Sequence, residues 1–343
     1  MNSVRRTIPA RREATLRAIP LLLAFAMALT FGADCRAASS PAGEKAYPSR
    51  PIRLVVPYAP GGGTDILGRL VGAKLTESWG QPVIIDNRPG GGTVIGTELV
   101  ARAPADGYTV LLGTGTHAVN ATLYPKLPFD PIRDFEPVTL LASAPNVLVV
   151  HPSLPVHTLK QFIAFARTRP GQINYGSSGN GGTGHLAMEM LKQMAKIDLL
   201  HVPYKGGGPA LNAVLTGEVS ALINNMIATV PQIKGGRLRA LGVTSSRRSP
   251  VVPEVPTLAE SGLPGFDAIG WFGVFLPAGT PPSIVDKLNS ELARIVRLPD
   301  VHRTLSGQGA EAIGNSKKEF AEIIQSDIAK WRTVLKAAHI VRD

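Results

Sequence analysis

Short apolar segments alternate with helical patterns from residue 53 almost to the C-terminus, and this alternation constrains the fold of the chain most. Apolar runs of about four residues are typical of strands buried on both faces of a parallel sheet. The segments between them repeat apolar residues at helical spacing, and alternating strands and helices predict α/β architecture. We expect strands at 53–56, 83–86, 109–113, 147–150, 173–175, 199–202, 220–223 and 240–243. We expect helices at 65–78, 94–102, 184–196, 209–216 and 283–297, with two more beginning at capping boxes near residues 158 and 316.

These elements form two series, which predicts two α/β lobes. Residues 47–145 together with 275–343 would form the first lobe, and residues 146–274 would form the second. The chain would cross between them near 144–146 and again near 270–274. Because ligands bind outside the carboxyl ends of parallel strands, we expect a site where the loops at those ends face each other.

The N-terminal segment has the pattern of a secretory signal. Arginines precede an apolar run at 19–31, and small residues follow up to Ala37. The run is short for a membrane span, so export to the periplasm with cleavage near Ala37 is expected. Cys35 is the only cysteine, and a mature chain without it could use neither thiol chemistry nor a cysteine metal site.

The net charge of +11 does not indicate nucleic-acid binding. Residues 1–37 hold six arginines and two acidic residues, so +7 remains for the mature chain. The remaining basic residues are scattered, without a dense run or interleaved aromatic residues. A mild positive field would favour anionic small molecules only weakly.

The first expected strand leads through Pro60 and three glycines, Gly61 to Gly63, directly into a helix. Glycines at this place let the backbone approach a ligand, and the first N–H groups of the helix attract an anion. The alternative is a tight turn in which Asp65 is an ordinary helix cap. Three consecutive glycines exceed what a turn needs, so we predict an anion-binding loop. A similar loop at 87–93 either packs beside it or is a supporting turn.

A third loop contains Gly179, Gly181 and Gly184 in the spacing G-x-G-x-x-G, after a strand and before a helix. This spacing is found in dinucleotide-binding folds, and Asp198 lies at a suitable distance. Export, the position in the middle of the chain and the neighbouring serines argue against a dinucleotide. Hydroxyl groups mixed with free N–H groups suit a carboxylate better. His185 at the helix start is more often a structural hydrogen-bonding residue than a base.

A fourth loop precedes another helix, with Pro209 expected at its first position. Lys205 in this loop is either a solvated surface charge or a group that attracts an anion.

Motifs for catalysis or metal binding are missing. The sequence has no Walker loop, no H-E-x-x-H and no G-x-S-x-G. Its seven histidines lack metal-ligand spacing, and the loops lack paired carboxylates. The sequence therefore predicts binding groups, with no catalytic residue, metal or cofactor.

Together these motifs resemble the tripartite tricarboxylate transporter substrate-binding family, also called Bug or TctC-like receptors. The resemblance extends from about Tyr47 to the C-terminus. It rests on the blocks at 56–65, 105–109, 174–185, 201–209, 270–273 and 277–281.

The resemblance implies a monomeric periplasmic binding protein of the type II (Venus flytrap) class. Its ligand would be a small carboxylate such as a di- or tricarboxylate, an acidic amino acid or a related organic acid. Its closed form would dock on membrane subunits of a tripartite tricarboxylate-type transporter. Two facing loops, 58–65 and 204–209, would hold the carboxylate, and residues of the third loop would complete the wall. The expected ligand-binding residues are Tyr58, Gly61, Gly62, Thr64, Asp65, Ser177, Ser178, Thr183, His185, Tyr204, Lys205, Gly206 and Pro209.

The chain departs from the family pattern at Ala213 and Ser220, where aspartate is common, and at Gly184, where proline is frequent. The first two concern lobe packing, whereas Gly184 could loosen the third loop. Two other functions stay open: an exported NAD(P)-dependent enzyme that uses the third loop, and a sensor accessory that docks on a membrane kinase.

Overall fold

A computed structural model describes residues 47–124 and 126–337, so the expected signal segment lies outside the described residues. The strands are β1 (Ile52–Val56), β2 (Val83–Asn87), β3 (Thr109–Thr114), β4 (Phe135–Val150), β5 (Asn174–Ser177), β6 (Leu200–Pro203), β7 (Ala221–Asn225), β8 (Arg239–Val243), β9 (Ile269–Pro277) and β10 (Glu311–Ala312). The helices are α2 (Gly63–Trp79), α3 (Val94–Ala101), α4 (Thr116–Leu123), α5 (Leu159–Arg167), α6 (Thr183–Ala195), α7 (Gly207–Leu215), α8 (Met226–Lys234), α9 (Pro282–Val296), α10 (Pro299–Gly307) and α11 (Lys317–Ala337), with a 3₁₀ turn at Gly91–Thr93.

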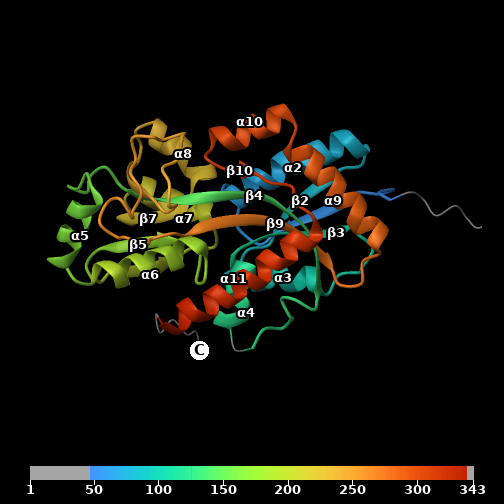
Figure 1. The fold of residues 1–343 in the computed structure, drawn as a ribbon, viewed down its shortest axis with the longest axis horizontal. Coiled ribbons are helices and arrows are strands. Elements are labelled where there is room, and N and C mark those ends of the chain that lie inside the picture. The colour runs from blue at the N-terminus through green and yellow to red at the C-terminus, as the bar shows by residue number, and fades with distance from the viewer. Residues whose placement is uncertain (1–46, 125, 338–343) are drawn as a thin grey trace, which may run out of the picture. The chain divides into compact units, whose positions relative to one another are not determined.

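The strands form two sheets joined by β4 (Figure 1). The first has the order β2-β1-β3-β9-β4, and β10 pairs with β4. The second has the order β4-β7-β5-β6, and β8 also pairs with β4. β1 pairs in parallel with β2 and β3, and β5 pairs in parallel with β6 and β7. In contrast, β4 and β9 pair antiparallel with their neighbours. Each sheet is therefore mixed, with a parallel part and an antiparallel connecting strand.

β4 is the physical link between the sheets. It pairs with β9 up to Pro145 and with β7 from Asn146 onward. β9 pairs with strands of the first sheet from Ile269 to Pro277. The lobe limits remain a prediction.

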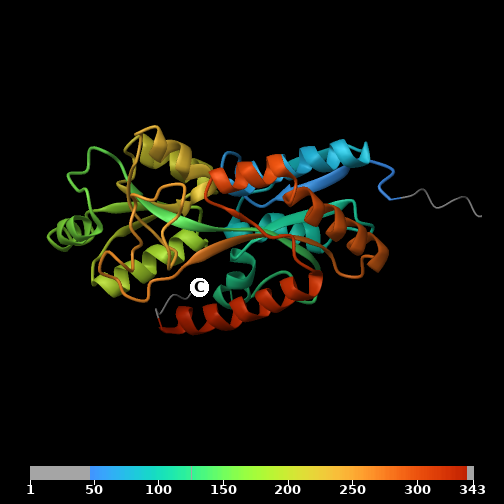
Figure 2. The same ribbon diagram turned by 45° about the horizontal axis from the view of Figure 1, so that its top comes forward.

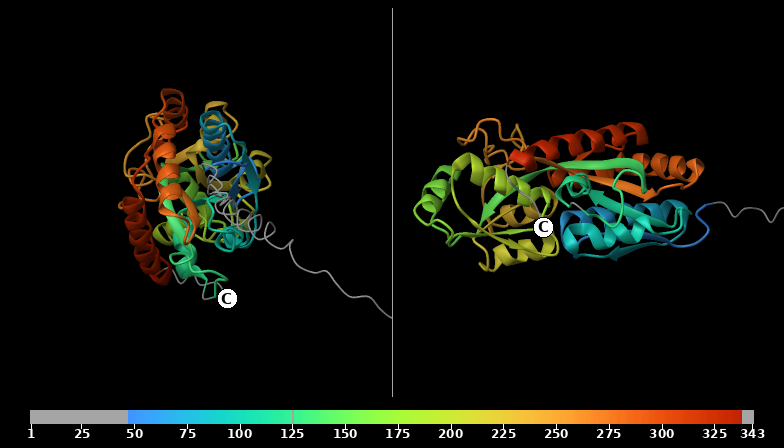
Figure 3. Two further views of the ribbon diagram at one scale, coloured as in Figure 1. Left: turned by 90° about the vertical axis from the view of Figure 1, so that its right-hand side faces the viewer. Right: turned by 90° about the horizontal axis from the view of Figure 1, so that it is seen from below.

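Helices cover both faces of the first sheet, as strand alternation requires. Leu54 and Val56 point toward the core under α2 and α9, whereas Val55 points toward the core under α3, α4 and α11. Figures 2 and 3 show α11 and α2 on opposite faces. The second sheet is packed in the same way, with α5 and α6 on one face and α7 and α8 on the other.

The helix starts follow the sequence signals with one correction. Ser316 and Glu319 form the predicted capping box, with hydrogen bonds of 2.9 Å and 3.3 Å. Thr158 caps α5 by accepting from the N–H of Gln161. Pro209 is the third residue of α7, not the first, because the helix already begins at Gly207. Within residues 47–124 and 126–337, no helix is long and apolar enough to cross a membrane.

Candidate functional site

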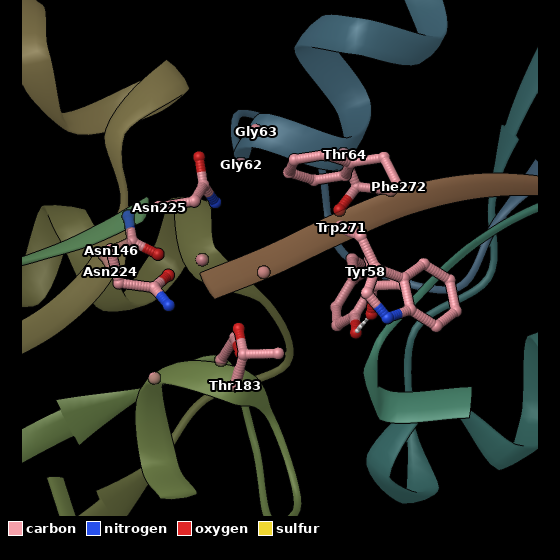
Figure 4. A pocket seen from close by; sticks show the side chains of 15 residues that line it. Tyr58, Gly62, Gly63, Thr64, Asn146, Thr183, Asn224, Asn225, Trp271 and Phe272 are labelled. Atoms are coloured by element: carbon pink, nitrogen blue, oxygen red, sulfur yellow. Dashed lines mark hydrogen bonds between the residues drawn. The ribbon is translucent and has the colours of Figure 1, made fainter. Parts of the chain in front are cut away.

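A small cavity, here called the central cavity, lies beside the strands that link the two sheets (Figure 4). Its volume is about 40 Å³. One water needs roughly 10–15 Å³ on this measure, so the space corresponds to a group of about three heavy atoms. It is lined by Tyr58, Gly62, Gly63, Thr64, Thr114, Asn146, Ser178, Thr183, Gly184, Gly207, Asn224, Asn225, Gly270, Trp271 and Phe272.

Three helices with glycine N-caps begin at this cavity. α2 starts there from the first sheet, and α6 and α7 start there from the second. Their N-cap residues are Gly62, Gly182 and Gly206, and none provides a side-chain hydrogen bond to the helix. The first N–H groups of a helix have no partner within it, and they carry the positive end of its dipole. The arrangement therefore favours an anion in the cavity.

Asn146 contributes a side-chain amide with unused hydrogen-bonding capacity. The residue is 1% exposed, and neither the nitrogen nor the oxygen of its side chain has a hydrogen-bond partner among the described residues. It lies at the point where β4 leaves the first sheet, and it borders the cavity (Figure 4). A buried amide without partners destabilises the fold by about 1–3 kcal/mol, so a ligand that bonds to it recovers that free energy.

Aromatic rings form the other wall of the cavity, from Tyr58, Trp271 and Phe272 (Figure 4). The Tyr58 hydroxyl lies 2.8 Å from Thr114 Oγ1 and donates to Thr116 Oγ1 at 3.0 Å. Burial raises the pKa of Tyr58, although these hydrogen bonds oppose the shift. The Trp271 indole nitrogen donates to Asp327 Oδ2 at 2.6 Å. Both polar groups are thus engaged with protein partners, which fixes the rings beside the cavity.

Charged side chains are absent from this lining. Its residues are glycines, hydroxyl and amide residues and the three aromatic residues, without Asp, Glu, Lys, Arg or His. Helix dipoles, hydroxyls and amides must therefore recognise any ligand here. No group of three His, Cys, Asp or Glu side chains suited to a metal ion occurs in the part of the chain that the structure describes.

Asp65 stabilises the first loop through hydrogen bonds. Its carboxylate accepts from the Gly61 N–H at 3.0 Å, from the Arg69 guanidinium at 3.0 and 3.1 Å, and from the Asn87 amide at 3.0 Å. Burial would raise the pKa of Asp65, but these hydrogen bonds outweigh it and hold the pKa below its ordinary value. Asp65 shapes the loop that carries Gly62 and Thr64.

The fourth loop borders a second cavity of about 190 Å³, here called the outer cavity, which shares Tyr58 and Ser178 with the central one. Tyr204 donates to Glu218 Oε1 at 2.7 Å, and its pKa is raised to about 12, first by burial and then by Glu218. Lys205 is exposed and has no ion-pair partner among the described residues. Its carbonyl oxygen accepts from the Ala59 N–H at 2.9 Å, which ties the fourth loop to the first.

The structure thus separates the predicted residues into groups. Tyr58, Gly62, Thr64, Ser178 and Thr183 line the central cavity, and Tyr204 and Lys205 line the outer one. The rest line neither cavity: Gly61, Asp65, Ser177, His185, Gly206 and Pro209. Their ligand contacts remain predictions.

Sequence reasoning missed several lining residues, namely Thr114, Asn146, Asn224, Asn225, Gly270, Trp271 and Phe272. Trp271 and Phe272 stand in one of the family-like blocks, which was the only signal for them. Gly184, noted as a departure, lies so close to β7 that a Cβ atom there would be 2.1 Å from the Ile223 carbonyl oxygen. The packing of α6 on β7 therefore requires a glycine at this position.

Comparison with solved structures identifies the class first: this mixed α/β fold is the two-lobed, type II fold of periplasmic binding proteins. A structure described as R. palustris Rpa4515 with adipate has a TM-score of 0.84 and 41% identity, covering 86% of this chain and 99% of that one. MatC (Rpa3494) from Rhodopseudomonas palustris with bound malate has a TM-score of 0.81 and 35% identity, covering 84% and 100%.

The chain belongs to the tripartite tricarboxylate transporter family receptors, whose sequence model matches residues 67–340. A UPF0065 protein in the tcbD-tcbE intergenic region of Pseudomonas sp. (strain P51) is 42% identical, over 84% of this chain and 87% of the relative. Protein BugT of Bordetella pertussis is 38% identical, over 87% and 92%.

Proposed function

We propose that this chain is a periplasmic receptor that captures a small carboxylate between its lobes and delivers it to the membrane subunits of a tripartite tricarboxylate-type transporter. The observation that carries this proposal is the convergence of three helix N-termini without side-chain caps on a cavity lined by no charged side chain. A carboxylate has three heavy atoms, which fits a cavity of about 40 Å³.

The relatives support a carboxylate as the ligand class. The structures with adipate and with malate are both more than 30% identical to this chain, and each is covered almost completely by it. Two ligands of different length bind to proteins of this fold, so we propose for this chain a site that binds one carboxylate group.

The outer cavity offers space for the rest of the ligand. It adjoins the central cavity through Tyr58 and Ser178, and its lining includes Lys205, which has no ion-pair partner among the described residues. A ligand with one carboxylate in the central cavity would place its chain or a second anionic group beside Lys205. We therefore expect dianions to bind more tightly than monoanions of the same length.

Capture would depend on contact between the first and fourth loops. The Ala59 N–H donates to the Lys205 carbonyl, and α2 and α7 begin next to each other at the cavity. Bringing these helix ends together around an anion excludes water and strengthens each hydrogen bond.

A thermal-shift panel tests the proposal directly. The purified chain would be heated with adipate, malate and other small carboxylates, and in parallel with acidic amino acids, NAD and NADP. A ligand at a hundred times its Kd stabilises the fold by about 2.7 kcal/mol, which raises the Tm by several degrees. We expect a shift with a carboxylate and none with the dinucleotides. A shift with NAD or NADP alone would instead support the enzyme that uses the third loop.

The docking partner needs a separate experiment. Membrane extracts would be passed over the immobilised protein with and without the ligand found in the panel. Ligand-dependent retention of transporter subunits is expected, whereas retention of a membrane kinase would assign the chain to a sensor.

A further inference from the structure

The third loop, residues 179–182, connects Ser178 to α6, and its residues Gly179 and Asn180 line the outer cavity. Ser178 before it contributes to both cavities, and the loop ends where α6 begins. Gly179 and Gly181 have φ angles of 123° and 74°, a region that only glycine adopts readily. A segment this rich in glycine has many accessible conformations, so something outside it must hold its shape.

The side chains of Ser177 and His185 hold the loop by accepting hydrogen bonds from its backbone N–H groups. Ser177 Oγ accepts from the Gly179 N–H at 3.1 Å and lies 2.7 Å from His201 Nε2. His185 Nδ1 accepts from the Gly181 N–H at 3.2 Å. The two imidazole rings are stacked, with centroids 4.2 Å apart. His185 is 8% exposed and lines neither cavity.

The contact with Gly181 requires a particular protonation state of His185. A backbone N–H can only donate, so Nδ1 must carry a lone pair, and the proton of the neutral ring must be on Nε2. Protonated Nδ1 would place two donors against each other and release the loop.

We propose that His185 is a positioning residue for ligand capture: as a neutral imidazole it fixes the third loop, which lines the outer cavity and leads into α6 at the central cavity. This inference rests on the proposed carboxylate site. His185 acts through the backbone of Gly181 and does not touch the ligand.

The surroundings of His185 keep it neutral. His201 on β6 stacks on it, and Glu189 and Lys192 on α6 form an ion pair of 2.9 Å nearby. Tyr175 on β5 donates to Glu189 at 2.5 Å. Burial lowers the pKa of His185 to about 4; Glu189 opposes this shift and Lys192 adds to it. The acceptor on Nδ1 is therefore present throughout the range in which an exposed histidine titrates.

A matched pair of variants separates positioning from simple packing. His185→Asn keeps an acceptor at the place of Nδ1, because the Asn Oδ1 atom occupies the corresponding position on the side chain. His185→Gln carries the same amide group one methylene farther out and moves the acceptor away. His157→Asn, at an exposed site, is the control. Each variant would be titrated calorimetrically with adipate and malate at pH 8, 7 and 6.

The expected results differ clearly between the variants. His185→Gln should weaken binding roughly tenfold, as the loss of one well-placed hydrogen bond implies. His185→Asn should stay within about threefold of the wild-type protein. Wild-type affinity should be level from pH 8 to pH 6. Equal affinities for the two His185 variants, or a wild-type affinity that falls steeply between pH 7 and 6, would overturn the inference.

Amide hydrogen exchange tests the stabilisation of the third loop by His185 without any ligand. The Gly181 and Gly182 amides should exchange faster in His185→Gln than in His185→Asn. Unchanged exchange in both variants would also overturn the inference. If the wild-type protein binds no carboxylate while the exchange difference is present, the proposed function is wrong, but His185 still stabilises the third loop.

Discussion

Gly208 determines how closely the two lobes can approach, because the first and fourth loops meet at this residue. A Cβ atom on Gly208 would lie 2.3 Å from the Pro60 carbonyl oxygen, 2.9 Å from the Gly61 carbonyl carbon and 3.0 Å from the Gly62 nitrogen. All three are backbone atoms of the first loop, which cannot turn aside as a flexible side chain can. Gly208→Ala would therefore force the loops apart by about 1 Å, since packed interiors transmit such strain.

The substitution should change affinity and intrinsic stability in opposite directions. Overpacking costs about 1–3 kcal/mol, which corresponds to a loss of roughly 5- to 150-fold in affinity if closure is needed for binding. Gly208 lies in the first turn of α7, and replacing a helical glycine by alanine stabilises by about 0.5–1 kcal/mol where space allows. In an open, unliganded protein the clash is absent, so the Tm should not fall.

The assay is calorimetric titration with the ligand from the thermal-shift panel, together with the Tm of each protein. Gly307→Ala is the matched control, because Gly307 ends α10 at an exposed position where an added methyl group would have no neighbouring atom within 4 Å. The control should bind like the wild-type protein. Wild-type affinity in Gly208→Ala would refute the reasoning, since the contact between the loops would then be irrelevant to the bound state.

Three further predictions concern the lining, the first loop and the buried histidines. Asn146→Leu removes two polar atoms that have no partner among the described residues, so it should weaken carboxylate binding in calorimetric titration, and an unchanged affinity would contradict this. Asp65→Ala deprives the Gly61 N–H of its acceptor and should weaken binding roughly tenfold in calorimetric titration without unfolding the protein. An unchanged affinity would show that the first loop does not contribute to binding. Burial lowers the pKa values of His117 and His185 to about 4, below about 6.5 in the unfolded chain, so their stabilisation is complete above pH 6.5. The contribution of each histidine to the free energy of unfolding should fall by up to about 1.4 kcal/mol per pH unit as the pH falls from 6.5 toward 4. The free energy of unfolding, measured in urea at several pH values, should therefore depend less steeply on pH in His117→Gln than in the wild-type protein.

The elements with strong local signals could be predicted from the sequence. β1 and α2 have an apolar run, a glycine turn and a regular helical stripe, and their predicted bounds were correct to within two residues. The helix at α9 was found for the same reason. In these segments the buried face depends on neighbours close in sequence, so the pattern itself carries the information.

Other elements depend on contacts that are distant in sequence. α8 was missed because Pro231 stands inside it, which argues against a helix. β9 contains Gly270 and Gly273, which weaken a strand pattern, yet Phe320 of α11 fills the space above Gly273. The first part of β4 was missed as well, although it pairs with β9 over nine positions.

The candidate site shows the same division. The glycine loops before α2, α6 and α7 could be predicted, since a strand, glycines and a helix follow one another along the chain. Asn146 could not, because its burial results from the crossing of β4 between sheets. A single asparagine in an apolar strand has no local pattern that marks it as a lining residue.

The central claim is that backbone N–H groups at three helix starts hold the carboxylate. Amide chemical shifts of the ¹⁵N-labelled protein, followed during titration with the ligand from the panel, test it most directly. We predict that the largest shifts fall on Gly63, Thr64, Thr183, Gly184 and Gly207, which line the central cavity at the starts of α2, α6 and α7. Shifts concentrated elsewhere, with these amides unchanged at saturation, would contradict the account.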